Sequence, residues 1–63
     1  MLLEERKTII LDYLNQHHMV DLQTLVTMTS ASESTLRRDL DSLEDEGLLI
    51  RVHGGAKLKK GAN

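Results

Sequence analysis

Apolar residues recur at helical spacing in three separate segments of the chain. The segments cover residues 3–18, 22–29 and 33–46. The clearest pattern is in the last segment, where Leu36, Leu40 and Leu43 form one continuous apolar stripe. The middle segment is short and rich in β-branched residues, so packing rather than intrinsic propensity must hold it. The pattern predicts three helices around an aliphatic core.

Polar residues mark where these helices begin and end. Asp21 and Ser32 each precede a helical pattern, and such side chains accept hydrogen bonds from the free N–H groups of a first turn. Gly47 can adopt the left-handed conformation that ends a helix. Residues 30–31 form a tight connection between the second and third helices. Residues 19–20 are expected to be a short extended link.

The apolar period changes after Gly47. The run LLIRV, residues 48–52, is rich in apolar and β-branched residues and predicts a strand. Gly54 and Gly55 can make a two-residue reversal, and AKLKK can pair back as a second strand. The predicted fold is mostly α with a small β-hairpin: a winged helix-turn-helix with a three-helix core. We expect residues 1–58 to form the domain and residues 59–63 to be a frayed tail or the start of a linker.

Composition narrows the possible functions. A chain of 63 residues makes one domain, and with no cysteine it has no disulfide and no thiolate metal site. The three histidines are too few and badly placed for a metal cage, so neither a metal nor a cofactor is expected. No apolar run approaches the ~18 residues of a membrane span, and MLLEERK is not a signal peptide. We therefore expect a cytoplasmic protein with no membrane partner.

The distribution of charge matters more than its sum. The formal net charge is −2, which alone argues mildly against a nucleic-acid partner. The acids, however, gather at the first helix and at the end of the third, where they form the run Glu44, Asp45, Glu46. That run is interpreted as a solvated helix end, with a partner surface or repulsion of non-target phosphate left open. The cations gather on the third helix and the hairpin, so one basic face is possible.

The third helix presents a polar face opposite its leucines. Ser34 and Arg38 lie opposite the stripe, and Thr35 and Arg37 flank them. Basic and hydroxyl side chains therefore come first along the helix and acids last, which fits a recognition helix whose N-terminal residues contact base edges. An arginine can pair bidentately with guanine. The alternative is a solvated face with a surface ion pair between Arg37 and Asp41.

The hairpin adds a second basic element. Arg51, His53 and Lys57 suit contacts to DNA phosphate or the minor groove, although His53 could instead only stabilise the turn. The candidate DNA-binding residues are Ser32, Ser34, Thr35, Arg37, Arg38, Arg51, His53, Gly54 and Lys57. An enzyme is not predicted, because the chain has no glycine-rich phosphate loop, paired catalytic carboxylates or nucleophile motif. The acidic run and net charge motivate one alternative, a winged-helix module that binds proteins and not DNA.

Residues 32–56, SESTLRRDLDSLEDEGLLIRVHGGA, resemble the N-terminal DNA-binding module of the DeoR family, the deoxyribose-operon-repressor-like bacterial regulators. The pieces that carry the resemblance are Ser-Glu-x-Thr-Leu-Arg-Arg-Asp-Leu and Arg-Val-His-Gly-Gly-Ala, and it extends over about residues 3–58. One departure is Ser30 and Ala31, where the family often has Gly-Val, which leaves the angle of the turn open. The resemblance implies sequence-specific binding of a double-stranded DNA operator by a repressor of sugar metabolism. It also implies a homo-oligomer whose sugar-phosphate effector binds a C-terminal domain absent from this chain. Residues 59–63 would then start the linker to that effector domain.

Overall fold

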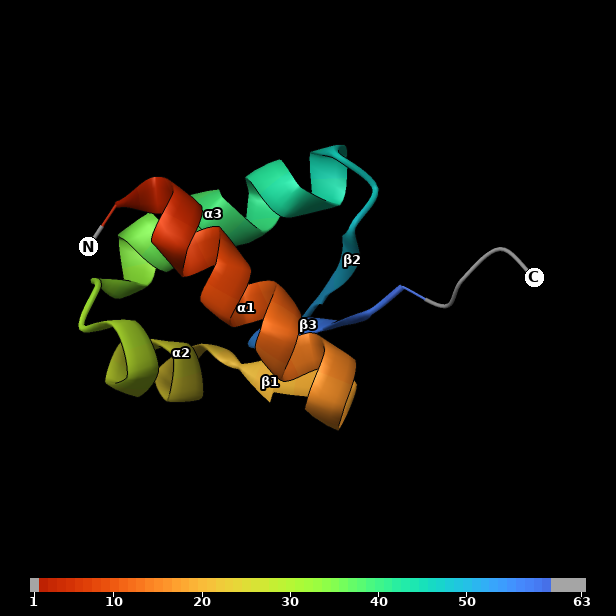
Figure 1. The fold of residues 1–63 in the computed structure, drawn as a ribbon, viewed down its shortest axis with the longest axis horizontal. Helices are drawn as coiled ribbons and strands as arrows, with labels where there is room; N and C mark the ends of the chain where they lie inside the picture. The colour runs from red at the N-terminus through yellow and green to blue at the C-terminus, as the bar shows by residue number, and fades with distance from the viewer. Residues whose placement is uncertain (1, 60–63) are drawn as a thin grey trace.

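The computed structural model describes residues 2–59, which form three helices and three strands (Figure 1). In chain order these are α1 (Leu3–His17), β1 (Met19–Asp21), α2 (Leu22–Thr29), α3 (Glu33–Asp45), β2 (Leu49–Val52) and β3 (Gly55–Leu58). The predicted helices are confirmed, each to within a residue at its end. Most of the predicted tail, residues 60–63, lies outside the described residues.

The core is aliphatic and draws on every element. Leu36, Leu40 and Leu43 are fully buried, so the predicted stripe of α3 does face the core. The remaining buried apolar residues are Ile10, Leu14, Val20, Leu22, Leu25, Leu49 and Ala56. Leu3, which shares the apolar pattern of α1, is 43% exposed because it lies in the first turn, beyond the core. The opposite face of α3 is thereby left to solvent.

The sheet has one strand more than the hairpin predicted from sequence. The expected link at residues 19–20 is part of β1, and the antiparallel sheet has the order β1-β3-β2. Figure 1 shows the sheet beside the C-terminal ends of α1 and α3. Because Val20 lies opposite Ala56 in β3 and both are buried, β1 joins the wing to the helical core. The wing, defined here as residues 49–58, is therefore anchored along the edge of β3 that pairs with β1.

The predicted Gly54–Gly55 reversal is wrong by one residue. The turn is made by His53 and Gly54, and Val52 pairs with Gly55, which already belongs to β3. Gly54 has φ +80°, the conformation that a glycine tolerates. Gly55 is needed for another reason: a Cβ there would lie 2.1 Å from the carbonyl oxygen of Val20. Close approach of β1, and not the turn, requires the second glycine.

The helix ends follow the sequence signals. Asp21 Oδ1 accepts from Thr24 N at 2.7 Å, and Ser32 Oγ accepts from Thr35 N at 3.2 Å, so both predicted caps are confirmed. Gly47 has φ +78°, as predicted, and its N–H donates to the carbonyl of Glu44. Ser30 also lies in the left-handed region, at φ +61°. The departure from glycine at this turn therefore places a serine where a glycine would be less strained.

Candidate nucleic-acid interface

The solvent face of α3 carries both arginines. Arg37 and Arg38 are exposed, with 59% of the Arg37 side chain accessible, while Leu36 and Leu40 beside them are fully buried. The ion pair of Arg37 is with Glu33, at 3.5 Å between Nη2 and Oε1, and not with Asp41 as the alternative interpretation proposed. An exposed pair of this kind is weak. Both guanidinium groups therefore remain accessible from outside the domain.

The N-terminus of α3 adds hydroxyl groups to this face. Ser32 Oγ accepts from Thr35 N and donates to Thr35 Oγ1 at 3.0 Å, so its hydroxyl serves the cap. Ser34 is exposed, with its Oγ 3.3 Å from that of Ser32. The free N–H groups and positive dipole end of a helix N-terminus favour an anion such as phosphate. Hydroxyls, N–H groups and arginines therefore occupy the same half of α3.

A partly buried ion pair sets the position of α3 against α1. Arg6 Nε donates to Asp39 Oδ2 at 2.6 Å and its Nη2 donates to Oδ1 at 3.3 Å, while Asp39 is only 4% exposed. The hydrogen bond from the guanidinium to Asp39 raises the pKa of Arg6. In the sequence, Asp39 stands out only as part of the Arg-Arg-Asp-Leu motif. The available signal was its place between Leu36 and Leu43 on the buried face, where an acid requires a partner.

The wing places its candidate residues in different environments. His53 and Gly54 are exposed at its tip. Arg51 turns instead toward α3, where its Nη1 donates to Asp41 Oδ1. Lys57 is exposed and lies opposite Met19 and Ile50 in the neighbouring strands, on the face of the sheet away from the core. The structure therefore does not bring Lys57 together with the arginines of α3.

A groove of about 300 Å³ lies between α3 and the wing. Arg37 contributes from the helix, Arg51 and His53 contribute from the wing, and Leu22 closes one side. The backbone N–H of Leu22 donates to the carbonyl of Gly54 at 2.9 Å, which holds the wing tip at the start of α2. Candidate residues from both elements therefore meet in this groove.

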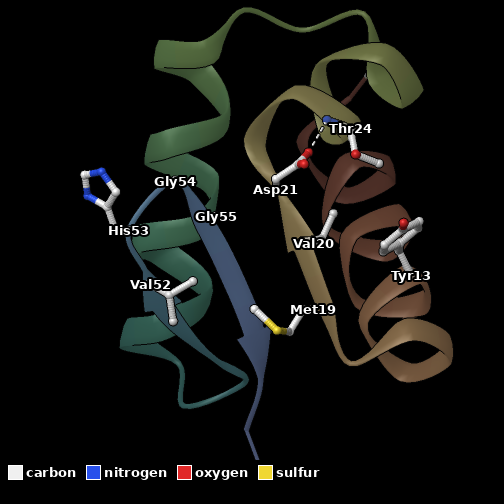
Figure 2. A pocket seen from close by; sticks show the side chains of 9 residues that line it. All are labelled: Tyr13, Met19, Val20, Asp21, Thr24, Val52, His53, Gly54 and Gly55. Atoms are coloured by element: carbon white, nitrogen blue, oxygen red, sulfur yellow. Dashed lines mark hydrogen bonds between the residues drawn. The ribbon is translucent and has the colours of Figure 1, made fainter.

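A second groove, of about 310 Å³, lies between α1 and the wing (Figure 2). Tyr13, Met19 and His53 line it, with Asp21 bonded to Thr24 at one end. Hydrogen bonds from the Thr24 hydroxyl and backbone N–H lower the pKa of Asp21. That carboxylate caps α2.

The described residues offer neither a metal centre nor a membrane span. Within residues 2–59 no three His, Cys, Asp or Glu side chains are grouped closely enough to hold a metal ion. The helices of the same range are too short and too polar to cross a bilayer.

The acidic run at the end of α3 contacts other parts of the domain. Glu46 accepts from Lys7 Nζ of α1 at 2.8 Å, and this hydrogen bond raises the pKa of Lys7. Glu44 Oε2 accepts from the backbone N–H of Arg51 at 2.9 Å. The run is exposed, as predicted for a solvated helix end, but two of its acids also hold α3 to its neighbours.

Comparison with known proteins identifies the family of the chain. Residues 6–61 match the model of the DeoR-like helix-turn-helix domain. The chain is 54% identical over 56 residues to the uncharacterized HTH-type transcriptional regulator FruR of Bacillus subtilis, covering 89% of the chain and 22% of the relative. It is 44% identical over 55 residues to the HTH-type transcriptional repressor GlcR of the same organism (87% and 21%). It is 39% identical over 54 residues to the glycerol-3-phosphate regulon repressor of Escherichia coli (86% and 21%).

The chain spans about a fifth of the length of these three relatives. No solved structure matches the chain.

Proposed function

Because the chain belongs to the family of DeoR-like helix-turn-helix domains, we propose that it binds a specific double-stranded DNA operator by inserting α3 into the major groove. Its relatives are named as transcriptional regulators and repressors, and not as enzymes. The observation that carries the proposal is the pair Arg37 and Arg38, exposed on the leading half of a helix whose other face is fully buried. A helix packed in this way can enter a groove without exposing its core.

The contacts divide by chemistry. Arg38 and Arg37 reach base edges, where a guanidinium pairs bidentately with guanine. Ser32, Ser34 and Thr35 donate to the backbone near the helix N-terminus. His53 and Gly54 of the wing approach a neighbouring phosphate, which the groove between Arg37 and His53 can receive. Lys57 lies on another face of the sheet and acts only at longer range.

The longer protein is proposed to regulate sugar use in the cytoplasm. Relatives include repressors named for a lactose phosphotransferase system, a glycerol-3-phosphate regulon and galactitol utilization. A C-terminal domain outside this chain would bind a sugar-phosphate effector and form the homo-oligomer. Two copies of this domain then meet two operator half-sites, which raises affinity above that of one domain.

The experiment is a binding measurement on operators selected from random duplexes with the isolated chain. Arg38→Ala is expected to weaken specific binding by about 1–3 kcal/mol, roughly five- to 150-fold, because a base contact is lost. Arg38→Lys is the matched control, since it keeps the charge and loses the bidentate geometry. It should retain non-specific binding and lose discrimination at one base pair. Unchanged operator affinity in Arg38→Ala would refute the docking of α3.

A further inference from the structure

Arg51 belongs to the wing but its side chain is used inside the domain. It lies in the same cross-strand row as the buried residues Val20 and Ala56, on the core side of the sheet. Its Nη1 donates to Asp41 Oδ1 and, at 3.5 Å, to the carbonyl of Arg37, both in α3. Only 25% of the Arg51 side chain is exposed. The guanidinium therefore bridges the wing and the helix that carries the candidate base contacts.

The backbone of Arg51 is held by the same helix. Residues of an antiparallel edge strand alternate in the direction of their N–H groups, and that of Arg51 faces away from β3. It donates to Glu44 Oε2 at 2.9 Å. Asp41 and Glu44 lie three residues apart, on one side of α3. Two acids of the helix thus hold the side chain and the main chain of one wing residue.

We propose that Arg51 is a positioning residue, and that Asp41 and Glu44 clamp it so that the wing keeps a fixed distance from the leading half of α3. The inference rests on the proposed DNA binding and revises one of its expected contacts, since Arg51 then neutralises Asp41 and not a phosphate. The hydrogen bond between the Gly54 carbonyl and the Leu22 N–H holds the wing tip from the other side, at α2. With this distance fixed by the clamp, the wing can reach a phosphate while α3 reaches a base edge.

The clamp predicts an unusual effect for an acid close to DNA. Removing an acid from a DNA-binding surface normally strengthens binding, because repulsion of phosphate falls. Asp41→Asn is expected to weaken operator binding instead, by roughly two- to tenfold, because the wing loses its anchor. The matched control is Asp45→Asn, one helical turn further along, which makes the same change in charge. The Asp45 side chain has no ion pair or hydrogen bond within residues 2–59. Equal or tighter binding by Asp41→Asn overturns the proposal.

The salt dependence of binding separates positioning from phosphate contact. A residue that neutralises a phosphate contributes about 0.9 to the slope of log affinity against log salt. Arg51→Gln is therefore expected to lose affinity several-fold with the slope unchanged, and the double variant Asp41→Asn/Arg51→Gln to lose no more than Arg51→Gln alone. A slope reduced by about one unit, or additive losses, overturns the clamp.

A third measurement does not depend on DNA. Glu44→Ala removes the acceptor of the Arg51 N–H, so hydrogen exchange at that amide should speed up in the free 63-residue chain. Glu46→Ala is the control, since Glu46 contacts Lys7 and not the wing. Equal exchange at Arg51 in the two variants overturns the clamp. If the unaltered chain binds no duplex while this exchange difference is present, the proposed function fails and the clamp stands.

Discussion

Gly55→Ala tests whether close packing of β1 against the wing holds the fold together. A Cβ at this position would lie 2.1 Å from the carbonyl oxygen of Val20 and 2.9 Å from the Cα of Asp21. Carbon and carbonyl oxygen normally approach no closer than about 3.3 Å, so the strands must separate by about 1 Å. Both obstacles are backbone atoms, which cannot rotate away. The added methyl group therefore acts on the pairing of β1 with β3.

The expected cost follows from overpacking and from the size of the domain. Overpacking typically lowers the free energy of unfolding by about 1–3 kcal/mol. Because the obstacle is backbone, we expect Gly55→Ala to lie at the upper end of this range. A chain of this length has a total stability of about 3–9 kcal/mol, at about 0.05–0.15 kcal/mol per residue. A loss of about 3 kcal/mol would lower the melting temperature by roughly 12–24 °C. The variant is therefore expected to melt far below the unaltered chain.

The assay is thermal unfolding followed by far-UV circular dichroism, with Gly54→Ala as the matched control. Gly54 has φ +80°, and no atom lies within 4 Å of the position that an added methyl group would take. Ala at Gly54 therefore lowers the free energy of unfolding only by the penalty of a left-handed alanine, about 1–2 kcal/mol. Gly55→Ala should be the more destabilised of the two neighbours. If the melting temperature of Gly55→Ala equals or exceeds that of Gly54→Ala, the crowding argument and the role given to β1 are both refuted.

Three further changes probe the core, a turn and a cap. Leu40→Ala should lower the free energy of unfolding by about 2–5 kcal/mol, because Leu40 is fully buried. Chemical denaturation should then show little folded protein. Ser30→Gly should raise stability by about 0.5–1 kcal/mol in the same measurement, by relieving a serine at φ +61°. The lowered pKa of Asp21 means that its contribution is present above the unfolded pKa and lost as pH falls through the folded pKa. Asp21→Asn should therefore flatten the acid limb of the stability profile.

The helices could be predicted because their signals are local. The stripe of Leu36, Leu40 and Leu43, the cap at Ser32 and the stop at Gly47 all act within a few residues of the chain. Each agrees with the others about where α3 begins and ends. The exposure of the arginines follows directly, since a helix that buries one face leaves the opposite one to solvent.

The sheet could not be predicted in the same way. β1 has three residues, too few for an alternating pattern, and its partner β3 is more than thirty residues away. The predicted turn of the hairpin was wrong by one residue, because Gly54 and Gly55 can both adopt turn conformations. The approach of Val20 to Gly55 distinguishes them, and that contact exists only in the folded chain.

The partners of the charged residues could not be predicted from the local sequence either. Asp39 and Arg6 are 33 residues apart, and Arg51 reaches Asp41 only after the wing folds back on α3. An i, i+4 rule suggested Asp41 as the partner of Arg37, but Asp41 is taken by Arg51, and Arg37 pairs with Glu33 instead. The sequence shows which residues are acidic or basic, but the three-dimensional fold decides which acid pairs with which base.

These pairings explain how a chain with a net charge of −2 can present a cationic surface. The acids of α3 and its C-cap that bond to cations or N–H groups of other elements are Glu33, Asp39, Asp41, Glu44 and Glu46. Their charge is largely compensated within the domain, whereas the Arg38 side chain has no ion pair or hydrogen bond within residues 2–59. Salt screens exposed charges beyond about 8–10 Å, so a phosphate near the leading half of α3 responds to the nearby arginines. Two acids of the run that motivated a protein-binding alternative, Glu44 and Glu46, thus contact the wing and α1 and hold α3 against them.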